Sequence, residues 1–195
     1  MSKPRLILAS KSPRRCELLR NTDTEFEVCV SGADEDKIPK DLPPQLYVQE
    51  LAVLKGTSVA DGYSKNCYVI AADTVVVYDG EIIGKPKDAE DAKRILTSLS
   101  GDTHFVYTGF SVTDAANMHT ASGYEVTEVH FKDLSENEID EYIASGAPFD
   151  KAGAYGIQGR AGLFADGIKG DFFNVVGLPL CALNKLMIKE FNISL

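Results

Sequence analysis

The sequence lacks tryptophan and contains few residues that bind metals through nitrogen or sulfur: three histidines and four cysteines among 195 residues. The cysteines are scattered without a CxxC pair, at Cys16, Cys29, Cys67 and Cys181. We therefore expect reduced thiols in a cytosol-like compartment rather than a disulfide framework. The histidines form no HExxH motif or other common ligand spacing, which argues against a structural zinc site.

Long apolar runs and an excess of basic residues are also missing. No run approaches the roughly 20 apolar residues that span a bilayer, and LILAS is too short for the apolar region of a signal peptide. We therefore expect a cytoplasmic protein without a membrane partner. The net charge of −9 argues against a nucleic-acid-binding surface, which needs a basic stripe. A small phosphorylated ligand remains compatible, because a local basic pocket or a divalent cation can outweigh global repulsion.

The pattern of apolar residues predicts a mixed α/β or α+β fold. A chain of 195 residues forms one domain over 1–195, or two small lobes that share a core. Period-two and short apolar runs predict strands at 5–10, 26–31, 104–114, 120–134 and 172–179, and two strands within 68–86 that are joined by Asp79-Gly80. Helical spacing and capping residues predict helices at 13–20, 46–59, 88–101, 135–146 and 180–191.

The first predicted helix carries cations where acids are normally preferred. Ser12 is a good N-cap and Pro13 suits the first helical position, so Arg14 and Arg15 fall in the first turn. Free N–H groups, the positive helix end and two guanidinium groups can converge on one phosphate. The alternative is that both arginines simply extend into water.

A second candidate is Asp73, which interrupts the nearly continuous apolar run VIAADTVVV. An unpaired buried carboxylate is costly, so such a residue usually meets a cation or metal, or takes part in catalysis. If Asp79-Gly80 is a two-residue turn, Thr74 lies opposite Lys85, which brings a lysine beside Asp73. A pocket shared by Asp73 and Thr74 would need a bulge, since neighbouring strand residues face opposite sides. The alternatives are a strand-end aspartate bonded to a turn and an exposed lysine.

Three further polar residues are weaker candidates on their own. Glu35 in GADED and Lys55 in LAVLKG are more often solvated surface charges, although Lys55 follows an apolar stripe and could turn inward at the helix end. Gln158 has the donor and acceptor groups that suit a base edge. Its glycine-rich segment is neither a Walker loop nor a dinucleotide fingerprint, and Gln158 could be an ordinary loop residue.

Taken together, the motifs resemble the Maf family of nucleoside triphosphate pyrophosphatases. The resemblance spans nearly the whole chain and is carried by LILASKSPRRCELL, GADED, LAVLKG, AADTVVV, GEIIGKP, LSGDTHFVYTG, FKDLSENEIDEYI, DKAGAYGIQGRAG and VVGLPL. It implies cleavage between the α- and β-phosphates to a nucleoside monophosphate and pyrophosphate, with Mg²⁺ or Mn²⁺. It also implies an elongated mixed sheet flanked by helices, with two lobes and a central cleft, similar to inosine triphosphate pyrophosphatases, and usually a homodimer.

The family motifs map onto nine positions of this chain: Ser10, Arg14, Arg15, Glu35, Lys55, Asp73, Thr74, Lys85 and Gln158. The resemblance implies that Asp73, Lys55, Lys85 and Glu35 are catalytic, with Asp73 and Glu35 as metal contacts, while Ser10, Arg14, Arg15, Thr74 and Gln158 bind substrate. The branch of the family that acts on dTTP and UTP carries Arg, Thr and Gln at three pocket positions. The branch that acts on 7-methyl-GTP carries an aromatic residue, Gln and Glu.

Arg14, Thr74 and Gln158 therefore place the chain nearer the dTTP/UTP branch. One departure is Gly56, where relatives usually have alanine after the lysine. Two other functions stay open. One is a pyrophosphatase for purine or modified nucleotides, and the other is a nucleotide-binding regulator of septum formation and cell division that hydrolyses nothing.

Overall fold

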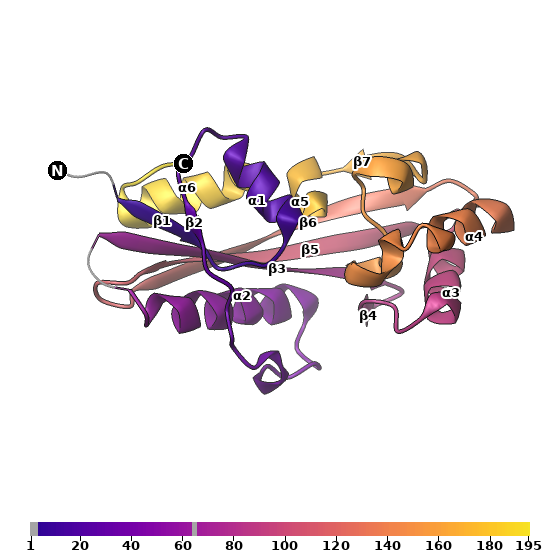
Figure 1. The fold of residues 1–195 in the computed structure, drawn as a ribbon. Coiled ribbons are helices and arrows are strands. Elements are labelled where there is room, and N and C mark those ends of the chain that lie inside the picture. Colours follow the sequence, from indigo (N-terminus) through magenta and orange to yellow (C-terminus); the bar gives the residue numbers. More distant parts are fainter. Residues whose placement is uncertain (1–3, 64–65) are drawn as a thin grey trace. The chain divides into compact units, whose positions relative to one another are not determined.

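The computed structural model describes residues 4–63 and 66–195, and its strands form one mixed sheet (Figure 1). The strands are β1 (Arg5–Leu8), β2 (Glu27–Val28), β3 (Cys67–Tyr78), β4 (Glu81–Ile83), β5 (Thr103–Asp114), β6 (Thr120–Phe131) and β7 (Ala165–Lys169). Their order is β2-β1-β3-β5-β6-β7, and β4 pairs with β3. β1 runs parallel to β2 and β3, whereas β4 is antiparallel to β3 and β7 to β6. The predicted class, a mixed sheet flanked by helices, is confirmed.

The chain divides into two compact units. The first comprises residues 1–73, 108–125 and 177–195, and the second comprises residues 74–107 and 126–176. The strands β3, β5 and β6 contribute residues to both units. Whether the units make one domain over 1–195 stays a prediction.

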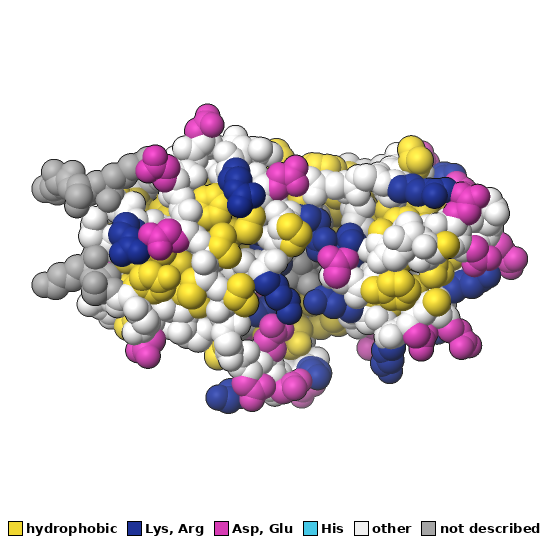
Figure 2. Space-filling model, viewed as in Figure 1, with side chains coloured by type: hydrophobic (Ala, Val, Ile, Leu, Met, Phe, Trp, Pro, Cys, Tyr) yellow, Lys and Arg dark blue, Asp and Glu magenta, His cyan; other side chains and the backbone are white. Residues whose placement is uncertain are grey.

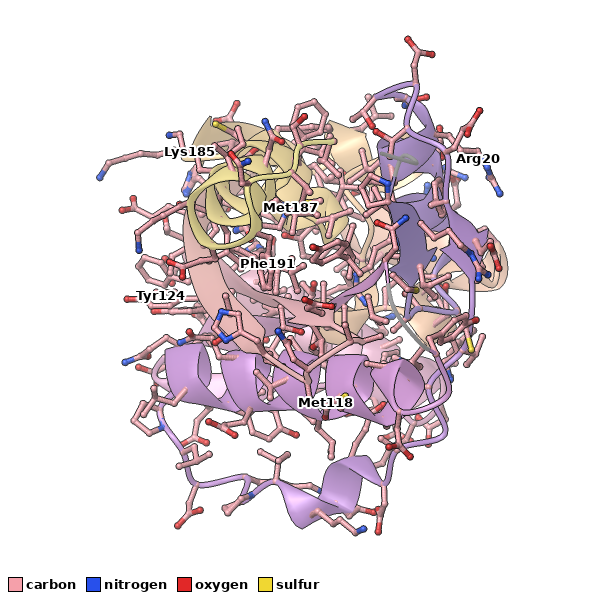
Figure 3. The ribbon with its side chains drawn as sticks, turned by 90° about the vertical axis from the view of Figure 1, so that its left-hand side faces the viewer. Arg20, Met118, Tyr124, Lys185, Met187 and Phe191 are labelled. Atoms are coloured by element: carbon pink, nitrogen blue, oxygen red, sulfur yellow. The ribbon has the colours of Figure 1, made fainter. Side chains whose placement is uncertain are left out.

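In the first unit, helices cover both faces of the strands. Its helices are α1 (Pro13–Arg20), the 3-10 helix η1 (Glu35–Lys37), α2 (Pro44–Ala60) and α6 (Leu180–Phe191). Figures 1 and 3 both show α2 on one face and α6 on the other. Phe191 reaches from α6 toward the strands, where its ring centroid lies 5.5 Å from that of Tyr68 and 5.3 Å from that of His119 (Figure 3). The predicted C-terminal helix is confirmed.

The second unit is built around an aromatic cluster. Its helical segments are α3 (Ala89–Leu99), α4 (Glu136–Ala144), η2 (Ala147–Asp150), η3 (Ala152–Ala154), η4 (Gly159–Leu163) and α5 (Phe172–Val176). The Phe131 ring packs edge-on against His104 and Tyr155 at centroid distances of 4.8 Å each, and against Phe164 at 6.0 Å. The cluster joins β5, β6 and the ends of η3 and η4.

The local signals for caps and turns are confirmed. The Ser12 hydroxyl accepts a hydrogen bond from the Arg15 N–H, and Pro13 begins α1. Ser135 and Glu138 form a complete capping box at α4. Asp79 and Gly80 have φ values of 50° and 79°, the positive pair that a two-residue hairpin turn requires.

Two expectations for strands are wrong. Residues 172–179 do not form a strand, because Phe172–Val176 is the helix α5. The Asp171 carboxylate accepts a hydrogen bond from the Phe173 N–H at 2.8 Å, and the Asn174 amide donates to the Val106 carbonyl at 2.9 Å, which fixes the helical turn in the core. The strand expected at 26–31 is only the two residues of β2, and β7 was missed because ADGIK has neither alternation nor a long apolar run.

No helix among residues 4–63 and 66–195 combines the length and the apolar character needed to cross a membrane.

Candidate active site

The loop between β1 and α1 is tied together by its own hydroxyl groups. Ser10 is buried, and its Oγ accepts a hydrogen bond from the Ser12 N–H at 3.1 Å. Ser12 then caps α1, whose first turn contains no acidic residue. The sequence therefore folds here, as predicted, into a helix whose first turn carries Arg14 and Arg15, and both arginines are partly buried.

Arg15 is anchored to the backbone of the first unit. Its Nε donates to the Gly177 carbonyl at 2.7 Å, and its Nη1 donates to the Ala72 carbonyl at 2.8 Å. Burial lowers the pKa of Arg15 and the positive charge of Arg14 lowers it further, whereas the Asp73 carboxylate opposes both effects. Arg15 thus joins α1, β3 and the Gly177 turn, and its guanidinium is held next to the residue that precedes Asp73.

Lys55 contacts both predicted catalytic carboxylates. Its Nζ makes a very short contact with Asp73 Oδ1 and lies 3.1 Å from Glu35 Oε1. The side chains of Lys55 and Asp73 are only 13% and 15% exposed, whereas that of Glu35 is 56% exposed. Glu35 projects from the loop that carries η1, where side chains of both charges gather (Figure 2). The structure thus brings Lys55, Asp73 and Glu35 together.

This arrangement bears on two predictions about lysines. Lys55 turns inward as expected, with only 13% of its side chain exposed, but it does so from within α2, which continues for five residues to Ala60. The lysine that contacts Asp73 is Lys55, and the expectation that Lys85 also lies beside Asp73 stays a prediction. Lys85 belongs to the second unit and is exposed. The helix α2 therefore supplies the cation that pairs with the strand carboxylate.

Gly56 allows α2 to lie close to β5. A Cβ atom at this buried position would lie 2.9 Å from Ser111 Oγ, and the Ser111 hydroxyl donates to the Ala52 carbonyl at 2.8 Å. The glycine does not interrupt α2. Relatives are expected to have alanine at this position. The glycine of this chain therefore lets α2 pack closer to Ser111, at the residue that follows Lys55.

Tyr47 was not among the predicted site residues. It lies eight residues before Lys55 on α2, a spacing that puts both side chains on one helix face. Burial raises the pKa of Tyr47, and the charges of Asp73 and Glu35 raise it further, while Lys55 and Lys40 oppose this. Its phenol therefore shares the electrostatic environment of the carboxylates. The spacing of Tyr47 and Lys55 is the signal that could have identified it.

Three predicted site residues, Thr74, Lys85 and Gln158, lie in the second unit. The hairpin register agrees with prediction, with Tyr78 opposite Glu81. The ladder ends at Ile83, however, and the next carbonyl, that of Gly84, accepts a hydrogen bond from Gly153. Thr74 and Lys85 are therefore not a ladder pair.

Thr74 is partly buried and follows Asp73 directly in β3, which is one uninterrupted element over 67–78. Gln158 is exposed immediately before η4. The bulge near Asp73 and the roles of these side chains toward a nucleotide stay predictions.

The carboxylates suit a divalent cation that is shared with a ligand. Within residues 4–63 and 66–195, no group of three or more His, Cys, Asp or Glu side chains could hold a metal by itself. Asp73 and Glu35 nevertheless converge on one ammonium group. Mg²⁺ is commonly bound by one or two carboxylates together with phosphate oxygens and water. The donor set therefore fits a metal that reaches the protein with a polyphosphate.

Comparison with known proteins gives one family. Residues 5–190 match the family model described as "Maf-like protein". A dTTP/UTP pyrophosphatase of Alkaliphilus metalliredigens is 50% identical over 98% of both chains. One of Geobacillus sp. is 51% identical over 90% of this chain and 92% of its own, and one of Dictyoglomus thermophilum is 45% identical over 95% of both.

Among solved structures, the likeness is distant. A Ham1 protein of Staphylococcus aureus has a TM-score of 0.46 at 16% identity and covers 66% of this chain and 72% of its own. A nucleoside-triphosphatase / dITP/XTP pyrophosphatase of Mycobacterium abscessus has a TM-score of 0.44 at 10% identity, with coverages of 67% and 75%. The fold class therefore rests on the chain's own strands and helices.

Proposed function

This chain belongs to the Maf family, and from that premise we propose that it is a nucleoside triphosphate pyrophosphatase. It hydrolyses the bond between the α- and β-phosphates and releases a nucleoside monophosphate and pyrophosphate. The observation that carries the proposal is the convergence of Lys55, Asp73 and Glu35 in the first unit. Attack of water on a phosphoryl group needs a general base and positive charge near the phosphate oxygens. Asp73 and Lys55 can supply these, and Glu35 adds a second carboxylate.

The residues of the first unit divide the work. Arg14 and the N–H groups at the start of α1 bind phosphate oxygens, while Arg15 adds positive charge and holds the backbone at Ala72. Asp73 orients the attacking water and accepts its proton. Lys55 offsets the negative charge that builds on the phosphoryl oxygens. Ser10 of the first unit and Lys85 of the second unit are proposed to add a hydrogen-bond donor and a further cation.

Asp73 and Glu35 would hold the divalent metal, Mg²⁺ or Mn²⁺. When bound, the metal supplies charge neutralisation and a lower pKa for water.

The preferred substrates are dTTP and UTP. Arg14, Thr74 and Gln158 match the residues of the dTTP/UTP branch, and relatives at 45–51% identity carry the name dTTP/UTP pyrophosphatase. Thr74 and Gln158 would read the polar edge of the pyrimidine through their donor and acceptor groups. A pyrophosphatase for purine or modified nucleotides is the second candidate.

A substrate panel tests the reaction and its preference together. The protein is mixed with Mg²⁺ and each common or modified triphosphate, and the monophosphate and pyrophosphate are measured. We expect both products, fastest from dTTP and UTP. A preference for a purine nucleotide would favour the second candidate, and nucleotide binding without any product would favour the non-catalytic regulator of cell division.

The variant Asp73→Asn tests the role of the carboxylate. The amide keeps the size of the side chain but cannot accept the proton, so kcat should fall at least about 100-fold, as for other general bases. Fluorescent-nucleotide titration should still detect binding, and thermal unfolding serves as the control for the fold. Turnover of dTTP at the wild-type rate would show that Asp73 is not the base.

We also propose a cytoplasmic homodimer without nucleic-acid or membrane partners. Free thiols at all four cysteines and a net charge of −9 support the compartment and the absence of a nucleic-acid surface. Light scattering on the purified chain tests the dimer, and a mass of 21.2 kDa would contradict it.

A further inference from the structure

The ammonium group of Lys55 lies between Asp73 and Glu35, the two carboxylates proposed to bind the metal. Lys55 Nζ contacts Asp73 Oδ1 directly and lies 3.1 Å from Glu35 Oε1. Lys55 is only 13% exposed, so its ammonium is not freely solvated and is held by these oxygens. The helix backbone around it is regular, and the buried Gly56 that follows packs toward Ser111. The helix α2 therefore places Lys55 where its flexible side chain can bridge Asp73 and Glu35.

A metal ion and this ammonium compete for the same oxygens. Mg²⁺ binds oxygen ligands at about 2.0–2.1 Å and demands near-octahedral geometry. An ion placed between Asp73 Oδ1 and Glu35 Oε1 would meet the Lys55 ammonium at close range, and like charges in a partly buried site repel strongly. Arg15 adds to this repulsion, since its Nη1 donates to the carbonyl of Ala72, the residue that precedes Asp73, at 2.8 Å.

We infer that Lys55 closes the metal site of the nucleotide-free protein. It satisfies Asp73 and Glu35 until a metal–polyphosphate complex arrives. The added negative charge of the phosphates then attracts the Lys55 ammonium away from the carboxylates and makes room for the metal. Lys55 is thus a positioning residue for the metal ligands, and it becomes a phosphate contact after the exchange. This inference rests on the proposed function for the identity of the polyphosphate, but the exclusion of metal by Lys55 is independent of turnover.

The test measures Mn²⁺ binding to the full chain in the absence of nucleotide. Free Mn²⁺ is followed by electron paramagnetic resonance during titration of wild type and of Lys55→Met, which keeps the length of the side chain but removes the charge. We expect Lys55→Met to bind Mn²⁺ about tenfold or more tightly than wild type, because removal of a nearby positive charge strengthens cation binding. The double variant Lys55→Met/Asp73→Asn should lose this gain.

Lys189→Met is the matched control. Lys189 pairs with Glu190 at 2.7 Å on the exposed side of α6, so its replacement makes the same change in net charge and also releases a carboxylate. Its Mn²⁺ affinity should equal that of wild type. If Lys55→Met binds Mn²⁺ no more tightly than wild type or Lys189→Met, with circular dichroism showing a folded chain, the inference is wrong.

A second measurement on wild type covers the case in which Lys55→Met does not fold. A dTTP analogue with a methylene bridge between the α- and β-phosphates should increase the affinity of the protein for Mn²⁺ about tenfold or more, because it draws Lys55 away from Asp73. Equal Mn²⁺ affinity of the protein with and without bound analogue, after correction for metal held by the free analogue, would overturn the inference.

The inference and the proposed function fail in distinguishable ways. If Lys55→Met gains Mn²⁺ affinity but wild type releases no pyrophosphate from any triphosphate, closure of the metal site by Lys55 is supported and the proposed pyrophosphatase activity is wrong. If wild type hydrolyses dTTP but neither Mn²⁺ measurement gives the expected gain, the hydrolase stands and the role of Lys55 is wrong.

Discussion

At the scale of single residues, Arg15 explains how a cation is tolerated at the positive end of a helix. A free guanidinium in the first turn of α1 is disfavoured by the helix dipole. Hydrogen bonds from Nε to the Gly177 carbonyl and from Nη1 to the Ala72 carbonyl offset this cost. Arg15 is therefore as much a structural tie as a source of positive charge for the phosphates.

Arg15→Lys should separate these two roles. Lysine keeps the charge but cannot donate to two carbonyls in the fixed fork geometry of arginine. Loss of a hydrogen bond from a charged group typically costs about 2 kcal/mol, and we expect a decrease of this size in the free energy of unfolding. Urea denaturation measures it, with Arg20→Lys at the exposed end of α1 as the control. Equal stability of Arg15→Lys and wild type would remove the structural role.

His104 should make the stability of the protein dependent on pH. Its Nε2 lies 2.7 Å from Tyr155 Oη, and its Nδ1 is a buried atom with no hydrogen-bond partner in the described part of the chain. Burial lowers the pKa of His104 from 6.5 to about 4, with Asp102 opposing and His130 reinforcing this shift. The unfolded chain therefore binds a proton between these two values that the folded chain does not bind.

Stability should fall as the pH decreases from 6.5 toward 4. One pKa unit corresponds to about 1.4 kcal/mol, so His104 accounts for a loss of up to about 3 kcal/mol over this range. In His104→Gln the residue no longer titrates, and the decrease between these pH values should shrink by that amount even though the variant is less stable overall. Urea unfolding at pH 7, 5.5 and 4.5 tests this. If the free energy of unfolding changed equally with pH in wild type and His104→Gln, the role of His104 would be contradicted.

At the scale of elements, the approach of α2 to β5 positions Lys55. Two buried glycines lie at this contact, one on each element. A Cβ at Gly109 of β5 would lie 2.2 Å from the Val48 carbonyl group, and a Cβ at Gly56 of α2 would lie 2.9 Å from Ser111 Oγ. The first neighbour is helix backbone that cannot move alone, whereas the second is a hydroxyl that can rotate.

The two glycines should therefore respond differently to alanine. Gly109→Ala must push α2 away from the strand and should destabilise the protein by about 3 kcal/mol or more, as overpacking in a rigid core does. Gly56→Ala gains up to about 1 kcal/mol of helix propensity, which offsets displacement of the Ser111 hydroxyl. Thermal unfolding of both variants measures the difference. A Gly109→Ala protein as stable as Gly56→Ala would contradict the close contact.

The sequence predicted features that depend on neighbouring residues better than features that depend on distant contacts. The caps at Ser12 and Ser135 and the turn at Asp79-Gly80 depend on residues within a few positions of each other, so local chemistry identifies them. The apolar run at 172–179 is equally compatible with a strand or a buried helix, and the distant partners of Asn174 decide for the helix.

In the candidate site, family motifs predicted which residues to consider, but the contacts of these residues were less predictable. The pairing of Lys55 with Asp73 joins residues 18 positions apart, and Arg15 reaches a carbonyl 162 positions away. Hairpin counting expected Lys85 beside Asp73 because it extends the ladder to Thr74 and Lys85, whereas the ladder ends at Val76 and Ile83. Tyr47 was missed because a partly buried tyrosine on a helix face is usually a packing residue.

At the scale of the whole molecule, a chain of net charge −9 must bind a highly negative substrate. The long-range repulsion between them is screened at physiological ionic strength, where the Debye length is about 8 Å. Within that distance the arginines of α1 and Lys55 act locally. A metal bound to the triphosphate reduces the charge of the substrate before it arrives, which favours binding of the metal and nucleotide together.

The thermal stability of the whole chain should report this joint binding. Because Lys55 bridges Asp73 and Glu35 in the nucleotide-free protein, Mg²⁺ alone should leave the Tm nearly unchanged, and EDTA should not unfold the chain. Mg²⁺ together with the α,β-methylene analogue of dTTP, at about 100 times its Kd, should stabilise the folded state by about 2.7 kcal/mol, because it binds only that state. For a chain of this size, the Tm should rise by about 5–10 °C. Differential scanning calorimetry with metal alone, analogue alone and both measures the three shifts. If metal alone produced the full rise, Asp73 and Glu35 would already be open to it, and a metal site closed by Lys55 would be wrong.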